Sequence, residues 1–333
     1  MREYNILLKK TKPSPNVLVK TLRDDPYGID GKSVVSVVHS NSRREGITEA
    51  LRLIGGISHL CEGVEGEIVI KPNCNTDDPF PRNTHHETVR IMVESLLNAG
   101  VSAERIVVGD MSGRSRGLPT RHTMENMGLN KVAKELNIRL SYFEEEDWVT
   151  VKPPSPFWFD GIRIPRRIYE ADRLILTPVI RPHPSATFTM SLKLGVGLID
   201  AVSREWLHNG KAFYEKLVEI NLAFPVDLVV TDCMKFFIDN VKWRYPHTKF
   251  VEPHIIIAAS NRVAADAVAI AIMKQFGAHG LTDKSVLKQR QLVLAEELGL
   301  GSPKIDNIIL KTSNLACDNN FESILSGIQT ELR

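Results

Sequence analysis

The sequence has few cysteines, and they lie far apart. Cys61, Cys74, Cys233 and Cys317 are the four cysteines in 333 residues, and none belongs to a C-x-x-C pair. Zinc ribbons and ferredoxin-type clusters need closely spaced cysteines, so the sequence carries no signature of either. Disulfide frameworks are typical of short secreted chains, and this chain is long. We therefore expect reduced thiols and a cytoplasmic location.

Neither sign of charge dominates, because 42 basic residues face 40 acidic ones and the net charge is +2. Nucleic acids and membrane surfaces bind a concentrated basic surface, so we expect neither as a partner. No stretch approaches the roughly 18 apolar residues that span a bilayer. Glu3 and a short apolar run make the N-terminus unlike a signal peptide. We expect a globular protein with a small-molecule partner, and a homo-oligomer stays open.

Apolar runs alternate with amphipathic segments along most of the chain. Residues 33–39, 67–71, 105–108 and 173–176 are short and rich in β-branched residues, as in buried strands. Helix-like segments at residues 42–54 and 264–276 follow two of the predicted strands. This alternation predicts an α/β fold with mostly parallel sheets flanked by helices.

Shifts in the pattern suggest the domain organisation. We expect an irregular N-terminal arm at residues 1–32, a first α/β lobe at 33–145, a second at 146–315 and a C-terminal tail at 316–333. Residues 148–165 read as a hairpin between the lobes, with Asp160 and Gly161 at its turn. Residues 232–253 form a polar and aromatic insertion. Thr84 and Glu87 have the spacing of a helix-capping box.

Polar residues gather after several predicted strands. In open α/β sheets, ligands bind beyond the carboxyl ends of the strands, so these residues are the candidate site. Neighbouring prolines would hold some of them in fixed positions, which catalytic groups need. The candidates that follow strands are Lys71, Asn73, Asn75, Arg114, Arg116, Arg181, His183 and Ser260.

Two lysines stand in apolar surroundings. Lys71 ends an apolar strand, and Lys193 lies in the otherwise apolar and small segment SLKLGVGL. Desolvation lowers the pKa of a lysine, which can then act as a base or nucleophile, and a charged lysine can hold an anion. The alternative for Lys71 is a solvent-facing side chain at a strand end. The alternative for Lys193 is an exposed side chain at a helix start.

His183 lies between two prolines, two residues after Arg181. This setting suits a general acid or base, or a metal ligand, because histidine titrates near neutral pH. The alternative is a rigid loop histidine satisfied by a backbone hydrogen bond. Arg181 would clamp an anion, and Asn73 would orient the substrate.

Two further positions remain open between a site role and a structural one. The loop with Arg114 and Arg116 is rich in glycine and serine and precedes a helix, which suits a phosphate or carboxylate. It is neither a Walker loop nor a G-x-G-x-x-G fingerprint, and the alternative is a solvated loop. Asp266 is expected in the first turn of a helix, where it either binds substrate or only offsets the helix dipole.

The segments VIKPNCN (residues 69–75), RPHPSATFTMSLKLGVGL (181–198) and ASNRVAADAVA (259–269) resemble the domain of unknown function 362 family of bacteria and archaea. The likeness covers most of residues 35–275. Family members often carry ferredoxin-like cysteine motifs, which this sequence lacks, and Leu194 stands where asparagine is usual. The layout is also similar to that of nickel-dependent lactate racemases, which use histidine and lysine on a two-domain α/β frame.

Three hypotheses of function follow. The first is an enzyme acting on a small carboxylate or phosphate, with His183 as acid or base and Lys71 and Lys193 holding the anion or sharing proton transfer. The second is a metal- or cofactor-dependent isomerase, racemase or redox enzyme with His183 and another histidine as ligands. The third is a non-catalytic binding or electron-transfer partner that docks through Phe236, Phe237, Trp243 and Tyr245. The sequence names no substrate, cofactor or metal.

Overall fold

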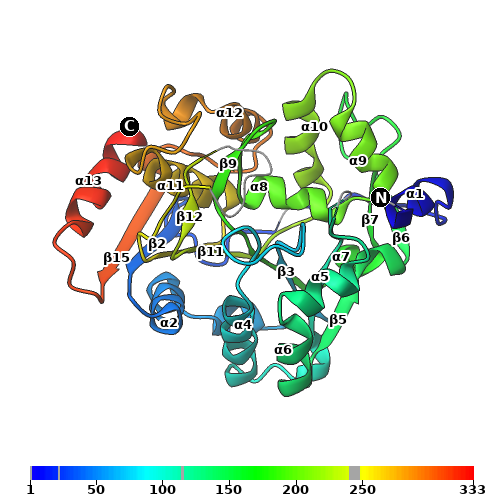
Figure 1. Ribbon diagram of the computed structural model, residues 1–333, viewed down its shortest axis with the longest axis horizontal. Coiled ribbons are helices and arrows are strands. Elements are labelled where there is room, and N and C mark those ends of the chain that lie inside the picture. The colour runs from blue at the N-terminus through cyan, green and yellow to red at the C-terminus, as the bar shows by residue number, and fades with distance from the viewer. Residues whose placement is uncertain (1, 22, 114–115, 240–247) are drawn as a thin grey trace.

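An eight-stranded sheet forms the centre of the computed structural model, which describes residues 2–21, 23–113, 116–239 and 248–333 (Figure 1). The order across the described sheet is β15-β2-β14-β11-β8-β3-β4-β5. The predicted α/β class is confirmed. The strands are β2 (Ser33–His39), β3 (Ile68–Pro72), β4 (Ile106–Asp110), β5 (Arg139–Tyr142), β8 (Arg173–Thr177), β11 (Leu228–Cys233), β14 (Ile255–Ala259) and β15 (Ile308–Asn314).

Strand β14 runs against its neighbours in this sheet. It is antiparallel to both β11 and β2, whereas the other described strand pairs of the sheet are parallel. Its first residue, Ile255, pairs with Cys233 and with His39, the last residues of β11 and β2. We call the side of the sheet where those strands end the carboxyl edge. Residues after β14 therefore leave the sheet at the opposite edge.

Helices cover both faces of the sheet, which explains why its strands are apolar on both sides (Figure 1). In β2, Val34 and Val38 join the core on one face, and Val35 and Val37 join the core on the other. The first face carries α2 (Arg43–Ile54), α4 (His86–Asn98) and α6 (Leu129–Glu135), and the second carries α11 (Arg262–Gln275), α12 (Arg290–Glu297) and α13 (Phe321–Glu331).

No described helix is long and apolar enough to cross a membrane.

Strands from both predicted lobes share this one sheet. Strands β2 to β5 come from residues 33–145, and β8, β11, β14 and β15 come from residues 146–315. The predicted hairpin is confirmed, since β6 (Trp148–Val151) and β7 (Ile162–Pro165) pair antiparallel. The strand ends of the two halves therefore meet along a common carboxyl edge.

The first residues are not irregular as predicted, because Arg2–Lys9 forms helix α1. Tyr4 is buried, and its hydroxyl donates a hydrogen bond to the carbonyl oxygen of Ala201, 3.0 Å away. Leu7 and Leu8 are partly buried against the same core. The spacing of these three residues gives α1 an apolar stripe, which packs on α9 (Ala201–His208).

The aromatic insertion does not present its phenylalanines to solvent. Phe236 and Phe237 form β12 and are both buried, with 0% and 3% of their surface exposed. The ring of Phe236 packs edge-to-face on Phe276, with 5.8 Å between the ring centres. The prediction that these two residues form a docking surface is therefore wrong. Trp243 and Tyr245 lie outside the described residues.

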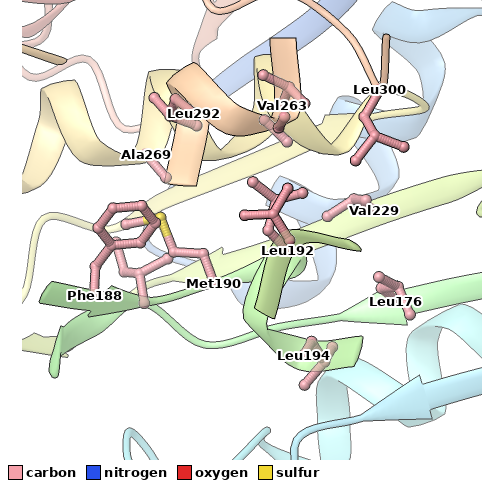
Figure 2. Packing of buried hydrophobic residues seen from close by; sticks show 14 of the residues in the cluster. Leu176, Phe188, Met190, Leu192, Leu194, Val229, Val263, Ala269, Leu292 and Leu300 are labelled. Atoms are coloured by element: carbon pink, nitrogen blue, oxygen red, sulfur yellow. The ribbon is translucent and has the colours of Figure 1, made fainter. Parts of the chain in front are cut away.

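The short helix α8 (Ser191–Leu194) is fixed by its apolar side chains. Leu192 is fully buried and belongs to the same core as Val229 of β11 and Val263 of α11 (Figure 2). Successive residues of a helix point about 100° apart, so Lys193 takes a different direction from Leu192. The core packing thereby sets the orientation of Lys193.

Candidate functional site

A small pocket lies at the carboxyl edge, beyond β3 and β4. Its volume is about 50 Å³. Among its described lining residues, four side chains are cationic and one is a carboxylate. We call it the cationic pocket. Its lining residues are Lys71, Asn73, Asn75, Asp110, Met111, Arg181, Thr189, Lys193, Leu194, Val196, Gly197 and Arg204.

Lys71 and Asp110 form a buried ion pair at the base of this pocket. Nζ of Lys71 lies 2.8 Å from Oδ1 of Asp110 and donates to the carbonyl oxygen of Pro72 at 3.0 Å. Asp110 also accepts hydrogen bonds from the backbone N–H groups of Cys74 and Met111, both at 2.8 Å. Such added hydrogen bonds are what a buried ion pair needs to offset its desolvation. The pair fixes the loops that follow β3 and β4.

Gly197 packs directly against this ion pair. A Cβ atom at position 197 would lie 2.4 Å from Oδ1 of Asp110 and 2.5 Å from Nζ of Lys71. Both distances are far below ordinary van der Waals contact, so a side chain at position 197 would push Lys71 or Asp110 out of place. The backbone after α8 can therefore approach the pair closely.

Lys193 reaches the pocket from α8 and is partly buried. Its pKa is lowered to about 7, first by burial and then by the positive charges of Arg181, Arg204 and Lys71. No hydrogen bond or ion pair links Lys193 to the rest of the described chain. At neutral pH its amine is therefore divided between the charged and the neutral form, which suits proton transfer.

Arg204 reaches the pocket from α9 and was not predicted from the sequence. It is buried, and its guanidinium donates to the carbonyl oxygens of Ser112 (2.6 Å), Met111 (2.7 Å), Ile199 (3.1 Å) and Gly197 (3.3 Å). Burial is the main cause that lowers its pKa. Its three-residue spacing from Ala201 and Leu207 places it on the buried side of α9, and that spacing is a sequence signal that could have found it.

Arg181 lies in the small hairpin of β9 (Arg181–His183) and β10 (Thr187–Thr189). It pairs in register with Thr189, and both line the pocket. Burial and then the charge of Arg82 lower the pKa of Arg181 to about 10, with Asp78 acting in the opposite direction. Its buried Nε has no hydrogen-bond partner within the described ranges.

His183 is not among the residues that line the cationic pocket. It pairs with Thr187 near the turn of the hairpin, farther along than Arg181. Its Nδ1 accepts hydrogen bonds from the backbone N–H groups of Ser185 (3.2 Å) and Ala186 (3.1 Å). These bonds hold the imidazole of His183 against the backbone of the hairpin turn, as the structural alternative predicted. An acid–base role for it stays a prediction.

Ser260 and Asp266 do not line the pocket either. Ser260 follows the antiparallel β14, so it lies at the opposite edge and hydrogen-bonds to Asp25. Asp266 accepts from the N–H groups of Ser191 (2.9 Å) and Leu192 (3.0 Å) and from the Ser191 hydroxyl (2.5 Å). It thereby caps α8 and positions Lys193 indirectly.

The loop after β3 holds the two asparagines of the pocket. Oγ1 of Thr84 accepts from the N–H of Asn73 at 2.8 Å and donates to the carbonyl oxygen of Thr177 at 2.6 Å. Thr84 thus links the ends of β3 and β8, and the predicted capping box is wrong. His85 caps α4 instead, since its Nδ1 accepts from the N–H of Glu87 at 3.1 Å.

The remaining predicted residues are Arg114 and Arg116. Arg114 lies outside the described residues. Arg116 forms an ion pair with Asp78 and does not line the cationic pocket. Across the described chain, no group of three or more His, Cys, Asp or Glu residues could hold a metal ion.

The segment of the chain that contains the pocket residues matches a known family. Residues 68–271 match the family described as "Domain of unknown function (DUF362)". The chain belongs to the DUF362 family. The match contains every described residue that lines the pocket. The family description states no activity.

Two comparisons find proteins that are similar to this DUF362 chain. It is 25% identical over 212 residues to the thylakoid-associated protein sll1697 of Synechocystis sp., which covers 60% of this chain and 62% of that protein. Its fold is similar to the lactate racemase apoprotein from Thermoanaerobacterium thermosaccharolyticum, with a TM-score of 0.44 and 16% identity over 70% of this chain and 56% of that one. This chain spans less than two thirds of the length of each of these two proteins.

Proposed function

We propose that this protein is an enzyme that binds the carboxylate or phosphate group of a small metabolite in the cationic pocket and uses Lys193 for proton transfer. The observation that carries the proposal is the excess of positive charge in the pocket. Of the described lining side chains, Asp110 is the one carboxylate, and it already pairs with Lys71. The charges of Arg181, Lys193 and Arg204 favour an anion there, because partial burial strengthens charge interactions.

The geometry supports separate roles in binding. Arg181 lines the pocket and has a planar guanidinium, so it would clamp the anion through parallel N–H donors. Asn73 and Asn75 line the pocket and would orient the substrate through their amides. Lys71 is paired with Asp110 and holds the floor of the pocket in place. Arg204 is held by backbone carbonyls and supplies a fixed charge.

Lys193 is the proposed proton-transfer group. An amine with a pKa of about 7 exchanges its proton readily at neutral pH, and enzymes tune catalytic lysines to this range. An anion bound next to Lys193 would favour the charged form and raise its pKa. Binding should therefore take up a proton at pH 8, and the charged amine can then act as an acid.

The size of the pocket limits what enters it. A water molecule needs roughly 10–15 Å³ of such space, so about 50 Å³ accommodates one small anionic group. The remainder of the metabolite would extend toward the rim.

The test is calorimetric titration of the protein with phosphate and with acetate at pH 8, in two buffers of different ionisation enthalpy. The expected result is binding with proton uptake in the wild type, and binding without proton uptake in Lys193→Gln. Lys131→Gln is the matched control, since Lys131 has a side chain that is 77% exposed. If neither these probes nor a panel of metabolites with such groups binds, the proposal fails.

Turnover separates an enzyme from a binding protein. Metabolites that stabilise the protein against heat should be consumed by the wild type, with a rate that rises or falls around pH 7 as Lys193 titrates. Lys193→Met should remove the reaction. Tight binding without turnover of any ligand would favour a non-catalytic role instead.

A further inference from the structure

A group of arginines adjoins the cationic pocket on the side of Arg181. Arg82 and Arg116 both form ion pairs with Asp78, and Nε of Arg82 lies 3.5 Å from the Asp78 carboxylate. Arg82 is also the strongest charge acting on the pKa of Arg181, and Asp78 is the next. We call Arg82, Arg116 and Arg181 the arginine cluster. Arg181 belongs to both the cluster and the pocket.

The loop after β3 holds this cluster in place. Asn83 is fully buried, and its side chain accepts from the N–H of Asn75 at 3.0 Å and donates to the carbonyl oxygens of Thr76 and Asp78, both at 2.6 Å. The guanidinium of Arg82 lies over the ring of Phe237, 5.5 Å from its centre. Both contacts limit the movement of the loop, so the cluster is a built feature of the fold.

We infer that the substrate of the proposed enzyme carries two anionic groups, one in the cationic pocket and the second at the arginine cluster. This inference rests on the proposed function. In the described part of the cluster, Arg82 and Arg116 share the carboxylate of Asp78, and Arg181 lies close enough for the charges of Arg82 and Asp78 to act on it. Bringing like charges together costs free energy. A second carboxylate or phosphate would offset that cost and accept charge-assisted hydrogen bonds. Arg181 would contact both groups.

The test compares matched probes at constant ionic strength by calorimetric titration. Each monoanion is paired with a dianion of the same backbone: acetate with malonate, propionate with succinate, butyrate with glutarate, and phosphate with pyrophosphate. At least one dianion should bind about tenfold more tightly than its partner, the effect of about one charged hydrogen bond. Several chain lengths are needed because the two groups must match the spacing of the sites.

Variants locate the second group. Arg82→Gln and Arg116→Gln should each reduce the dianion advantage and leave the affinity for the matched monoanion unchanged. Arg116 has a side chain that is 44% exposed, so its variant should fold even if Arg82→Gln does not. Arg52→Gln is the control, since Arg52 lies in the last turn of α2 with a side chain that is 67% exposed. It should change neither affinity.

Each outcome has a distinct meaning. If dianions and monoanions bind equally well to the wild type, the inference is overturned and the proposed function stands. It is also overturned if both cluster variants keep the full dianion advantage. If neither these probes nor the panel of metabolites binds at all, the proposed function itself fails.

Discussion

The amine of Lys71 and the carboxylate of Asp110 meet across the ends of two neighbouring strands, with Nζ 2.8 Å from Oδ1. Both side chains are almost completely buried, at 1% and 3% exposure. Because Asp110 also binds two backbone N–H groups, the pair connects the loops after β3 and β4 into one floor under the pocket. The other cations of the pocket are arranged above this neutral base.

Breaking this pair should destabilise the protein strongly. Lys71→Met leaves Asp110 buried without its cation, and we expect the free energy of unfolding to fall by about 3 kcal/mol. Asp110→Asn should have a similar effect. The double variant should lose clearly less than the sum of the two, as urea denaturation would measure. Strict additivity would show that the two groups do not interact.

The close approach of Gly197 can be tested with one added methyl group. Gly197→Ala places Cβ against both Lys71 and Asp110, so we expect a loss of about 2 kcal/mol of stability and weaker anion binding. Gly195→Ala is the control, because its Cβ would first meet the ring edge of Phe224 at 3.1 Å. Equal effects of the two substitutions on thermal unfolding would contradict this account.

Removing the charge of Lys193 should stabilise the free protein. The pKa of Lys193 is about 7 in the fold against 10.5 for an ordinary lysine. Between these values the unfolded chain holds the extra proton, so wild-type stability rises with pH across this window. Below pH 7 the charged amine costs stability in full, and Lys193→Met should be more stable by about 1 kcal/mol. The difference should vanish toward pH 10.

Urea denaturation at several pH values would check this expectation, with Lys131→Met as the exposed control. A Lys193→Met protein that is less stable than the wild type at pH 6 would show that the amine has a favourable partner.

The buried carboxylate of Asp266 should give stability the opposite pH dependence. Burial raises its pKa to about 6, against 3.8 for an ordinary aspartate. Between these values the folded protein holds the extra proton, so this group makes stability fall as pH rises toward 6. Asp266→Asn should lack that contribution. The difference between the two proteins across pH 4–6 is the measurement, and parallel curves would rule the titration out.

Much of the pocket could be predicted from the sequence, because one rule covers it. Lys71, Asn73 and Asn75 end or follow a buried strand, and Arg181 and Lys193 follow the next strand of the sheet. Parallel strands end at the same edge, so these residues are expected on the same side of the sheet. That step needs only the positions of strands along the chain.

The residues whose positions or roles were not predicted from the sequence are placed by strand direction and by tertiary contacts. Nothing in residues 255–259 signals that β14 is antiparallel, and its reversal carries Ser260 to the far edge. Thr84 is a residue type that often caps helices, but its hydroxyl instead accepts from the N–H of Asn73 after β3 and donates to the carbonyl oxygen of Thr177 in β8. Arg204 is placed by carbonyl groups from loops far away in the sequence.

The reversal of β14 also decides where this protein can vary. Cys233 and Ile255 are paired in register at the carboxyl edge, so the chain leaves the sheet and returns to it at one point. The entropy of closing a loop between two such fixed ends grows only slowly with its length. A change in the length of the segment between them should therefore cost little stability, provided that Phe236 and Phe237 keep their places in the core.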